Sequence, residues 1–449
     1  MGRLFGTDGA RGVANTEITC ELATKIGRAT AMVLSENTDN KLKIIIGTDT
    51  RKSADMLSCA LASGLCSVGA DVIMLGVVPT PAVAYLVKKC GYDAGVMISA
   101  SHNPYEYNGI KIFRSDGYKL PDKVEDEIEA IILDEVRIPP VVIGEAVGSI
   151  TYAENAVSDY VNHIASTADK TFEGMKIALD CANGSASVTA ERLFRKTGVE
   201  YEIINASPDG MNINNSCGST HIEVLSSFVC ENSFDAGFAF DGDADRVLAV
   251  DRNGNVIDGD MLMAVAAKYM KDKNKLSGNT LVATVMSNMG LFEFCDKNGI
   301  LCEKTAVGDR YVLERMIEKG YCLGGEQSGH IIFLDHSTTG DGQLSAVQIL
   351  NIIRNTGKSL DELVSEVEIF PQVLKNVRVS AFGKLRLSED DDIRLAVEKA
   401  EKELGNSGRI LVRASGTEPL VRVMIEGRDK EKTEKLSNMI AAVIKERLI

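Results

Sequence analysis

The stretch that decides the fold of this chain is Asp-Ala-Gly-Phe-Ala-Phe-Asp-Gly-Asp-Ala-Asp, residues 235–245. Its first half is a short apolar run, which predicts a buried strand, and its second half is an acidic turn. The letters Asp-Ala-Gly recur at residues 93–95, where DAGVMISAS (93–101) also leads from an apolar run into a polar loop. A third such stretch is YCLGGEQSGHIIF (321–333). A strand that ends in a small polar loop therefore occurs three times.

Each of these stretches closes a block in which short apolar runs alternate with longer helical patterns. The earlier runs are KIIIGTDT (43–50) and DVIMLGVV (71–78), then KIALDCANG (176–184) and EYEIINASPDG (200–210), then NTLVATVMSNMG (279–290) and CEKTAVGDRYV (302–312). This alternation predicts βαβ units and largely parallel sheets. We therefore expect an α/β protein with three similar mixed α/β domains. Because ligands gather beyond the carboxyl ends of strands in such sheets, their loops are expected to line one central cleft.

The chain after about residue 370 follows a different pattern. The runs QVLKNVRVS (372–380) and RILVRASGTEPLVRVMIEG (409–427) are typical of strands. They alternate with two amphipathic helical patterns, one marked by Ile393, Val397, Ala400 and Leu404 and the other running to the C-terminus. This predicts a fourth, smaller α+β domain. The predicted domain boundaries are 1–152, 153–250, 251–368 and 369–449.

Composition excludes several classes of protein. The 449 residues exceed one ordinary domain, and 45% hydrophobic with 25% charged residues is usual for a globular chain. A net charge of −15 argues against binding to nucleic acid or to an anionic membrane, although the segment after residue 370 is slightly basic. No run approaches the ~20 apolar residues of a membrane span, and the N-terminus lacks a signal peptide's apolar core. We expect a cytoplasmic protein, either monomeric or homodimeric.

The ten cysteines give no sign of a metal site or a disulfide framework. They are spread from residue 20 to residue 322 without a C-x-x-C pair. Zinc sites need such local spacing, so buried, reduced thiols are the favoured interpretation.

The first polar loop contains Ser101. It reads Ser-Ala-Ser-His-Asn-Pro from residue 99, and Asn-Gly follows at 108–109, just before Lys111. Asn-Pro and Asn-Gly favour turns, so Ser101 is expected on an exposed bend at a strand end, where a nucleophile or phosphate carrier would sit. A serine that merely caps a turn is the alternative. A Ser–His hydrolase is not favoured, because neighbouring residues of an extended chain point to opposite sides and G-x-S-x-G is absent.

The second polar loop holds Asp241, Asp243 and Asp245. Three carboxylates at a spacing of two can converge if the loop curls, and such close like charges disfavour folding unless a cation neutralises them. Hard oxygen ligands suit Mg²⁺. An EF-hand is excluded, because Arg246 and Arg252 stand where it needs Gly and Glu. A solvated acidic loop is the alternative.

Two further loops offer groups for a sugar and a phosphate. Glu326, Gln327 and Ser328 lie between two glycines and mix donors with acceptors, as a polyhydroxylated ligand requires, although a structural glycine-rich turn explains them equally well. The loop from Arg413 to Pro419 combines an arginine and two hydroxyls around a glycine, which suits a phosphate or sulfate. A plain hairpin turn is the alternative there.

These four loops, in this order, resemble the α-D-phosphohexomutase superfamily. The resemblance runs from FGTDGARG (5–12) through ASHNP (100–104), DGDADR (241–246) and GEQSGH (325–330) to RASGTEP (413–419), and so covers almost the whole chain. It implies three similar α/β domains and a C-terminal domain around one cleft. Within the superfamily, the opening residues and Gln327 are most similar to members that act on glucosamine phosphates. Relatives acting on mannose or glucose phosphates typically have Met at the position of Gln327.

The resemblance also implies roles for individual residues. Ser101 would carry a phosphoryl group and would bind Mg²⁺ together with Asp241, Asp243 and Asp245. The reacting centre would include Arg11, His102, Lys111, Arg246 and His330. The sugar would contact Glu326 and Ser328, and a phosphate would contact Arg413, Ser415, Gly416, Thr417 and Arg422. Some relatives have His where this chain has Asp309, so a sugar contact there is not carried over.

The implied reaction converts glucosamine 6-phosphate into glucosamine 1-phosphate through a 1,6-bisphosphate, which would also serve as activator. His330 or Lys111 would be the base, and the product would feed UDP-N-acetylglucosamine synthesis. The nearest alternative is a phosphomannomutase or phosphoglucomutase with the same mechanism. Two other classes remain open: a phosphatase with an aspartyl-phosphate at Asp241, and a non-catalytic sugar-phosphate binding protein.

Overall fold

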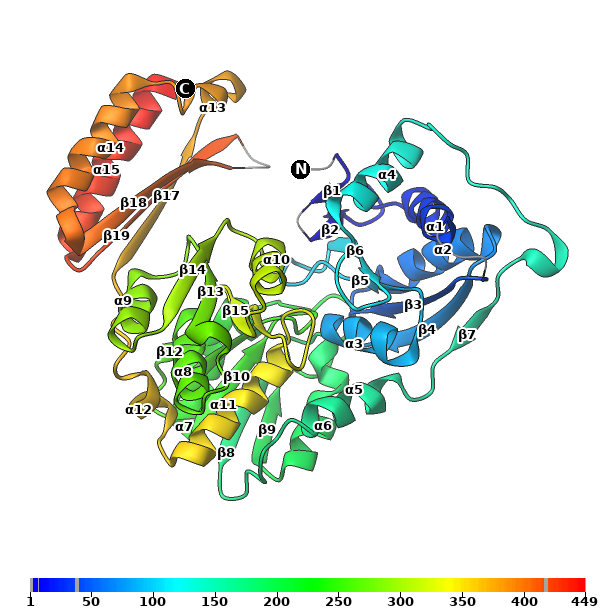
Figure 1. Cartoon of the computed structure of the whole chain (residues 1–449), viewed down its shortest axis with the longest axis horizontal. Helices are drawn as coiled ribbons and strands as arrows, with labels where there is room; N and C mark the ends of the chain where they lie inside the picture. Colours follow the sequence, from blue (N-terminus) through cyan, green and yellow to red (C-terminus); the bar gives the residue numbers. More distant parts are fainter. Residues whose placement is uncertain (1–2, 7, 37–39, 416–418, 449) are drawn as a thin grey trace. The chain divides into compact units, whose positions relative to one another are not determined.

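The computed structural model describes residues 3–6, 8–36, 40–415 and 419–448. The chain forms two compact units. The first unit contains residues 1–287 and 298–365, and the second contains residues 288–297 and 366–449. Each unit has its own sheets and its own hydrophobic core (Figure 1).

Three sheets belong to the first unit, here given in the order of their hydrogen-bonded strands. The first contains β1 (Phe5–Gly6), β2 (Gly9–Val13), β6 (Tyr107–Arg114), β5 (Ala94–Ile98), β3 (Lys43–Thr48), β4 (Asp71–Val77) and β7 (Ile150–Tyr152). The second contains β12 (Val256–Ile257), β11 (Val247–Asp251), β10 (Ala236–Phe240), β8 (Lys176–Asp180) and β9 (Glu200–Ile204). The third contains β14 (Leu301–Thr305), β13 (Thr280–Thr284), β15 (Leu323–Gly325) and β16 (Ile331–Phe333).

The three sheets share a four-strand arrangement. The shared orders are β4-β3-β5-β6, β9-β8-β10-β11 and β14-β13-β15-β16. In each, the first three strands are parallel and the fourth is antiparallel. The prediction of three similar mixed α/β domains is therefore confirmed. The antiparallel fourth strand was not expected.

Helices connect these strands. They are α1 (Cys20–Ser35), α2 (Ala54–Ser67), α3 (Thr80–Cys90), α4 (Asp122–Leu133), α5 (Ala156–Ala165), α6 (Ala190–Thr197), α7 (Ile222–Asn232), α8 (Gly259–Asp272), α10 (Asp309–Lys319), α11 (Gly342–Thr356) and α12 (Leu360–Val364). Side-chain caps mark several starts: Thr19 for α1, Asp258 for α8 and Asp341 for α11. Successive residues Ile44, Ile45 and Ile46 of β3 are all fully buried, as expected for a parallel strand covered on both faces.

The second unit is an antiparallel sheet with helices. Its strands, in spatial order, are β17 (Gln372–Arg378), β19 (Leu420–Gly427) and β18 (Gly408–Ala414). Its helices are α9 (Met289–Lys297), α13 (Ala381–Arg386), α14 (Asp391–Leu404) and α15 (Lys430–Leu448). Alternate residues Val421, Val423 and Ile425 of β19 are fully buried and share a core with α14 and α15. The fourth, smaller α+β domain is confirmed, and the predicted boundaries at residues 152, 250 and 368 stay a prediction.

Two general expectations can be compared with the structure. All ten cysteines lie in the described part of the chain, and all are free thiols, as expected. Five of them are not buried, with Cys59, Cys90 and Cys230 exposed, so the expected burial is wrong for these thiols. Among the described residues, no helix combines the length and apolar character needed to cross a membrane.

Candidate active site

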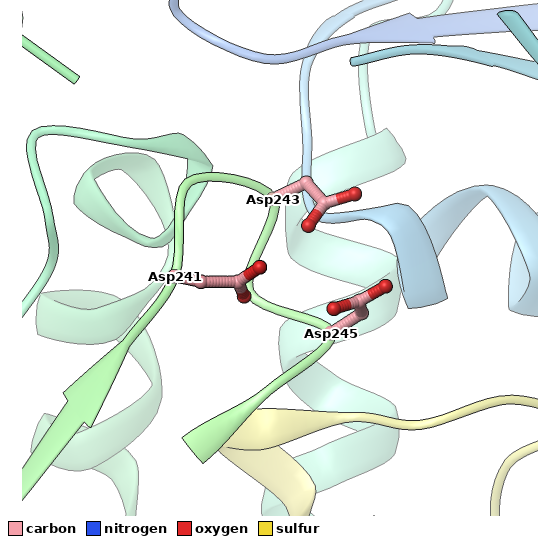
Figure 2. A group of neighbouring side chains, drawn as sticks. All are labelled: Asp241, Asp243 and Asp245. Carbon is pink, nitrogen blue, oxygen red and sulfur yellow. The ribbon is translucent and has the colours of Figure 1, made fainter. Parts of the chain in front are cut away.

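The carboxylate loop (residues 241–246) joins β10 to β11 and gathers three buried aspartates. Figure 2 shows the side chains of Asp241, Asp243 and Asp245 turned toward one another, and one oxygen from each lies within 4.8 Å of the others. Ala244 has a φ of 56°, which curls the loop. A Cβ at Gly242 would lie 2.7 Å from the carbonyl oxygen of Ser101, so this position requires glycine. The convergence expected from the spacing is present.

The serine loop (residues 99–104) follows β5, at the place in the first sheet that the carboxylate loop has in the second. Ser101 is 1% exposed, so the exposed bend predicted for it is wrong: the loop packs against the carboxylate loop. Its φ is 51°, a conformation that few residues other than glycine adopt. Its Oγ donates a hydrogen bond of 2.5 Å to Oδ2 of Asp241. The hydroxyl predicted to carry phosphate therefore lies against the carboxylate cluster.

Lys111, on β6, supplies a buried cation to this cluster. Its Nζ lies 2.9 Å from Asp243 Oδ2, 3.0 Å from Asp8 Oδ2 and 3.5 Å from Asp245 Oδ2. Burial alone would lower the pKa of Lys111, but these carboxylates raise its pKa above the ordinary value. Lys111 is therefore a fixed positive charge at the centre of the site.

The aspartates of the loop differ in acidity. Burial, followed by the charges of Asp245 and Asp243, raises the pKa of Asp241 well above its usual range. Burial acts in the same direction on Asp245, but Lys111 and His330 outweigh it and hold the pKa of Asp245 below its usual range. Carboxylates that raise one another's pKa become fully ionised when a cation joins them.

The cluster fits a divalent metal ion. The buried atoms Asp243 Oδ1 and Asp245 Oδ1 accept no hydrogen bond from the described residues. Buried carboxylate oxygens ordinarily have partners, and an all-oxygen donor set is what hard divalent cations prefer. The three aspartates together can therefore hold such an ion.

His102 and Arg246 lie beside the Ser101 hydroxyl. His102 Nδ1 is 3.4 Å from Ser101 Oγ and 3.1 Å from Arg246 Nη1. Burial, with help from nearby arginines, lowers the pKa of His102 to about 4. The main-chain N–H of Arg246 donates to Asp241 Oδ1 at 3.1 Å, so Arg246 is tied to the carboxylate loop as well.

Asp8 and Lys119 extend the charge network, and neither was predicted as a site residue. Arg11 Nη2 lies 2.5 Å from Asp8 Oδ2, and Lys119 Nζ lies 2.6 Å from Asp8 Oδ1. Burial would raise the pKa of Asp8, but the three cations around it hold its pKa well below the usual range. A signal for Asp8 was present, since it lies in the same glycine-rich stretch as Arg11.

Asp309 links this network to His330. Its Oδ2 lies 2.6 Å from Lys119 Nζ and 3.5 Å from His330 Nε2, while His330 Nδ1 lies 3.7 Å from Asp245 Oδ2. Burial would lower the pKa of His330, but the two carboxylates raise it. The structure thus brings Arg11, His330 and the carboxylate loop into one group through paired charges.

The glutamate loop (residues 325–330) occupies the equivalent place in the third sheet, between β15 and β16. Glu326 Oε1 accepts a hydrogen bond of 3.1 Å from the N–H of Gly308, and burial raises the pKa of Glu326. Ser328 is exposed. Gln327 Nε2 donates to Asp258 Oδ2 at 3.0 Å, so its side chain is engaged with the start of α8.

The predicted phosphate loop lies in the second unit, between β18 and β19. Arg413 and Arg422 are directly opposite each other on these strands. Burial and the charge of Arg422 lower the pKa of Arg413. The N–H of Ser415 donates to the carbonyl of Leu420 at 2.9 Å and closes the hairpin. Gly416 and Thr417 lie outside the described residues.

Family models match nearly the whole chain. They are described as phosphoglucomutase/phosphomannomutase domain I (residues 2–137), domain II (158–254), domain III (258–370) and C-terminal domain (374–443). The chain belongs to this family. Proteins of the phosphoglucomutase/phosphomannomutase family are phosphohexomutases, so the resemblance inferred from the loops is confirmed and the chain is an isomerase.

Individual relatives agree with this assignment. Phosphoglucosamine mutases from Ruminiclostridium cellulolyticum and Acetivibrio thermocellus are each 55% identical over 448 residues, covering 100% of both chains. A phosphoglucomutase/phosphomannomutase family structure from Burkholderia thailandensis, 24% identical, has a TM-score of 0.82 and covers 100% of this chain and 98% of that one. An Aspergillus fumigatus N-acetylphosphoglucosamine mutase structure, 17% identical, has a TM-score of 0.68 with coverages of 100% and 96%. These two structures support the fold of the phosphohexomutase.

Proposed function

We propose that this phosphohexomutase interconverts glucosamine 6-phosphate and glucosamine 1-phosphate in the cytoplasm, and so supplies UDP-N-acetylglucosamine synthesis. The observation that carries the proposal is the hydrogen bond from Ser101 Oγ to Asp241 at the edge of the aspartate cluster. It occurs in a chain 55% identical over its whole length to phosphoglucosamine mutases.

Ser101 is the phosphoryl carrier in this proposal. The oxygen of the sugar 1-hydroxyl forms a bond to the phosphorus while the bond from phosphorus to Ser101 Oγ breaks, which gives a 1,6-bisphosphate. After the intermediate reorients, Ser101 Oγ takes the 6-phosphoryl group and glucosamine 1-phosphate leaves. A hexosamine or hexose 1,6-bisphosphate would restore a dephosphorylated enzyme, and would thus act as activator.

The surrounding residues position groups and balance charge, which is most of what phosphoryl transfer requires. Arg11 and Lys111 would face the phosphoryl oxygens. Of the two residues considered as the base for the sugar hydroxyl, His330 and Lys111, we retain His330, whose Nδ1 lies 3.7 Å from Asp245 Oδ2. The raised pKa of Lys111 keeps its amine protonated, so Lys111 does not act as the base. Arg246 and His102 would hold the serine end of the site, since they contact each other beside Ser101.

Asp241, Asp243 and Asp245, together with phosphorylated Ser101, would hold one Mg²⁺. When bound, this ion would neutralise charge on the phosphoryl group being transferred. Asp243 is well suited to such a ligand role, because Thr80 Oγ1 and Lys111 Nζ fix its Oδ2 at 2.6 and 2.9 Å while its Oδ1 accepts no hydrogen bond from the described residues.

The remaining predicted residues would bind the rest of the substrate. Glu326 and Ser328 would contact sugar hydroxyls. The phosphate that is not reacting would lie at the hairpin of the second unit, bound by Arg413, Ser415, Gly416, Thr417 and Arg422. Two arginines opposite each other on neighbouring strands repel, and an anion between them would remove that cost.

The test combines mass and kinetics. Intact mass should rise by one phosphoryl group when the dephosphorylated enzyme meets glucose 1,6-bisphosphate, and Ser101→Ala should abolish the rise. Then kcat/KM is compared for glucosamine 6-phosphate, glucose 6-phosphate and mannose 6-phosphate. We expect the amino sugar to be favoured. A higher kcat/KM for glucose or mannose phosphates would support the alternative of a phosphoglucomutase or phosphomannomutase, and free phosphate without isomerisation would contradict both.

A further inference from the structure

Arg51 is a buried arginine that holds the main chain of the serine loop. Its side chain is 0% exposed and pairs with Asp49 at 2.8 Å. Its guanidinium donates to the carbonyl oxygens of Ser101 (2.8 Å) and Asn103 (2.8 Å), and also to those of Pro104 and Tyr107. One side chain therefore binds four carbonyl groups in and just after the loop.

Asn214 reaches the same loop from the second sheet's side of the first unit. Its Nδ2 donates to the carbonyl oxygens of Ser101 at 2.9 Å and Asn103 at 3.1 Å, which are two of the four that Arg51 binds. Asn214 is 7% exposed, and its Oδ1 accepts no hydrogen bond from the described residues. The buried side-chain amide of Asn214 therefore donates two hydrogen bonds to the main chain of the serine loop.

The two donors lie on segments that are joined to each other. Thr50 Oγ1 donates to the carbonyl of Asn183 at 2.7 Å, and the N–H of Lys52 donates to the carbonyl of Gly210 at 2.8 Å. These bonds flank Arg51 and connect its turn to the loops that follow β8 and β9. Arg51 and Asn214 therefore act on the serine loop as one clamp.

The other side of Ser101 is held as well. Its N–H donates to Ser99 Oγ at 3.0 Å, and Ser99 Oγ donates to Asp49 Oδ2 at 2.6 Å, the oxygen that also receives Arg51. These contacts fix both the N–H and the carbonyl of a residue whose φ is 51°. Such a conformation costs of the order of 1 kcal/mol in a residue other than glycine and needs surroundings that enforce it.

We propose that Arg51 and Asn214 are positioning residues for phosphoryl transfer at Ser101, holding it in the left-handed conformation that aims Oγ at the carboxylate cluster. The proposal rests on the proposed function for its kinetic consequence. Within the described structure, the bonds of both side chains to the loop end on main-chain oxygens, so neither is a catalytic residue. Loss of the clamp should slow transfer without weakening substrate binding.

The test uses Asn214→Gly, because glycine accepts the φ of 56° at this position. Asn205→Gly is the matched control. Asn205 has a φ of 51°, and its amide donates to Asp180 at 3.0 Å instead of to the serine loop. Uptake of phosphate by each enzyme from glucose 1,6-bisphosphate is followed by rapid quench and intact mass, and KM and Tm are measured in parallel. Arg51→Lys, which keeps the charge but not the planar fork, provides a second variant.

We expect Asn214→Gly to slow phosphoryl uptake by about 10- to 100-fold, since misplacing a reactive group by about 1 Å has effects of this size. KM should stay within about twofold, and the control should keep the wild-type rate. Equal rates for wild type and Asn214→Gly, or equal losses in variant and control, would overturn the clamp. A wild-type enzyme that takes up no phosphate would instead contradict the proposed function.

A second measurement does not depend on turnover. Hydrogen exchange at the amide of Ser101 should be faster in Asn214→Gly than in Asn205→Gly, because the clamp opposes opening of the loop. Unchanged exchange at Ser101 would count against the clamp even if the enzyme were inactive.

Discussion

The serine loop and the carboxylate loop occupy equivalent places, each between the third and fourth strands of a repeated sheet. Both are held through their main chains, and they differ in what engages their side chains. The serine loop is fixed through its main chain, by donors such as Arg51 and Asn214, which leaves the Ser101 hydroxyl to Asp241. The carboxylate loop is also held through its main chain, where the carbonyls of Gly242, Asp243 and Ala244 accept from N–H groups, but its carboxylates are engaged as well, by Lys111 and Thr80. One repeated framework thus presents a nucleophile at one loop and a charge cluster at the other.

The largest expected effect comes from removing the hydroxyl of the serine loop. Ser101→Ala deletes the phosphoryl carrier but leaves the main-chain bonds of that loop in place. Mutase turnover should fall by at least about a thousandfold, because loss of a nucleophile removes the covalent route. A coupled assay measures turnover, and Tm should remain within a few degrees of the wild type. Full activity in this variant would eliminate the phosphoserine mechanism.

The second largest effect is expected on the free energy of unfolding, when the cation beside the carboxylate loop is removed. Lys111→Met leaves buried carboxylates without their central cation, which typically costs about 3–5 kcal/mol. The free energy of unfolding is measured in urea with and without MgCl₂. Magnesium should restore more stability to the variant than it adds to the wild type, because it supplies the missing positive charge.

Lys88→Met is the control for that experiment, since Lys88 is exposed on α3. Its free energy of unfolding should change by no more than about 0.5 kcal/mol. Equal stabilisation of Lys111→Met and wild type by magnesium would show that the ion does not replace the charge of Lys111, and no stabilisation of either would contradict the metal site.

These two loops also indicate what a sequence can predict. Their positions followed from apolar runs that end in polar turns, and the aspartate cluster followed from three like charges too close to tolerate without a cation. The antiparallel fourth strands of the three sheets, β6, β11 and β16, were not predicted. The shortest of them, β16 (Ile331–Phe333), spans three residues, which is too few for an alternating pattern to stand out. Its partner β15 fixes it by hydrogen bonds that no local signal records.

The charge partners were harder to predict than the loops. Lys111 and Asp243 are 132 residues apart in the chain, so no local spacing relates them. The sequence placed Lys111 shortly after Ser101, but it gave no sign that this lysine would pair with the carboxylate loop. Lys119 and Arg51 were not expected at all. Arg51 is buried and the Lys119 side chain is 10% exposed, and the role of each depends on groups that folding brings to it. The aspartates, in contrast, could be predicted because three like charges lie so close together in the sequence.

Asp341 is a further buried carboxylate, and its hydrogen-bond partners are neutral groups instead of a cation such as Lys111. Asp341 begins α11 beside the carboxylate loop, where the N–H of Gly342 donates to Ala244. Asp341 Oδ1 accepts from the N–H of Leu344 at 2.9 Å, and both of its oxygens accept from Tyr160 at 3.0 Å. Burial raises the pKa of Asp341 to about 7.

The sign of the pH effect follows from that shift. Between about pH 4 and pH 7 the folded state keeps a proton on Asp341 that the unfolded chain has lost, so this residue's contribution to stability falls as pH rises. Asn at this position still accepts both hydrogen bonds but does not titrate. Relative to wild type, Asp341→Asn should gain about 2–3 kcal/mol between pH 5 and pH 8, measured by urea unfolding. Parallel pH profiles would show that Asp341 is ionised in the folded protein.

The smallest effect is expected at the glutamate loop, the third loop in this series. Gln327 differs from the Met typical of relatives acting on other sugars, yet its amide donates to Asp258 at the start of α8. Gln327→Met should therefore cost about 1 kcal/mol for one lost hydrogen bond. The ratio of kcat/KM for glucosamine 6-phosphate to that for glucose 6-phosphate should change by less than about threefold, because this side chain is engaged with the helix.

Gln348→Met provides a matched control for this last comparison. Gln348 also makes a side-chain amide bond, to Thr167 Oγ1 at 2.9 Å, but lies on α11 outside the three loops. Both variants should lose similar stability in urea, and both should keep the sugar preference. A shift of more than tenfold in preference for Gln327→Met alone would mean that this residue contacts the sugar directly. Gln327 would then bind the substrate with its own side chain, as proposed for Ser101 in the serine loop, instead of only holding the glutamate loop against α8.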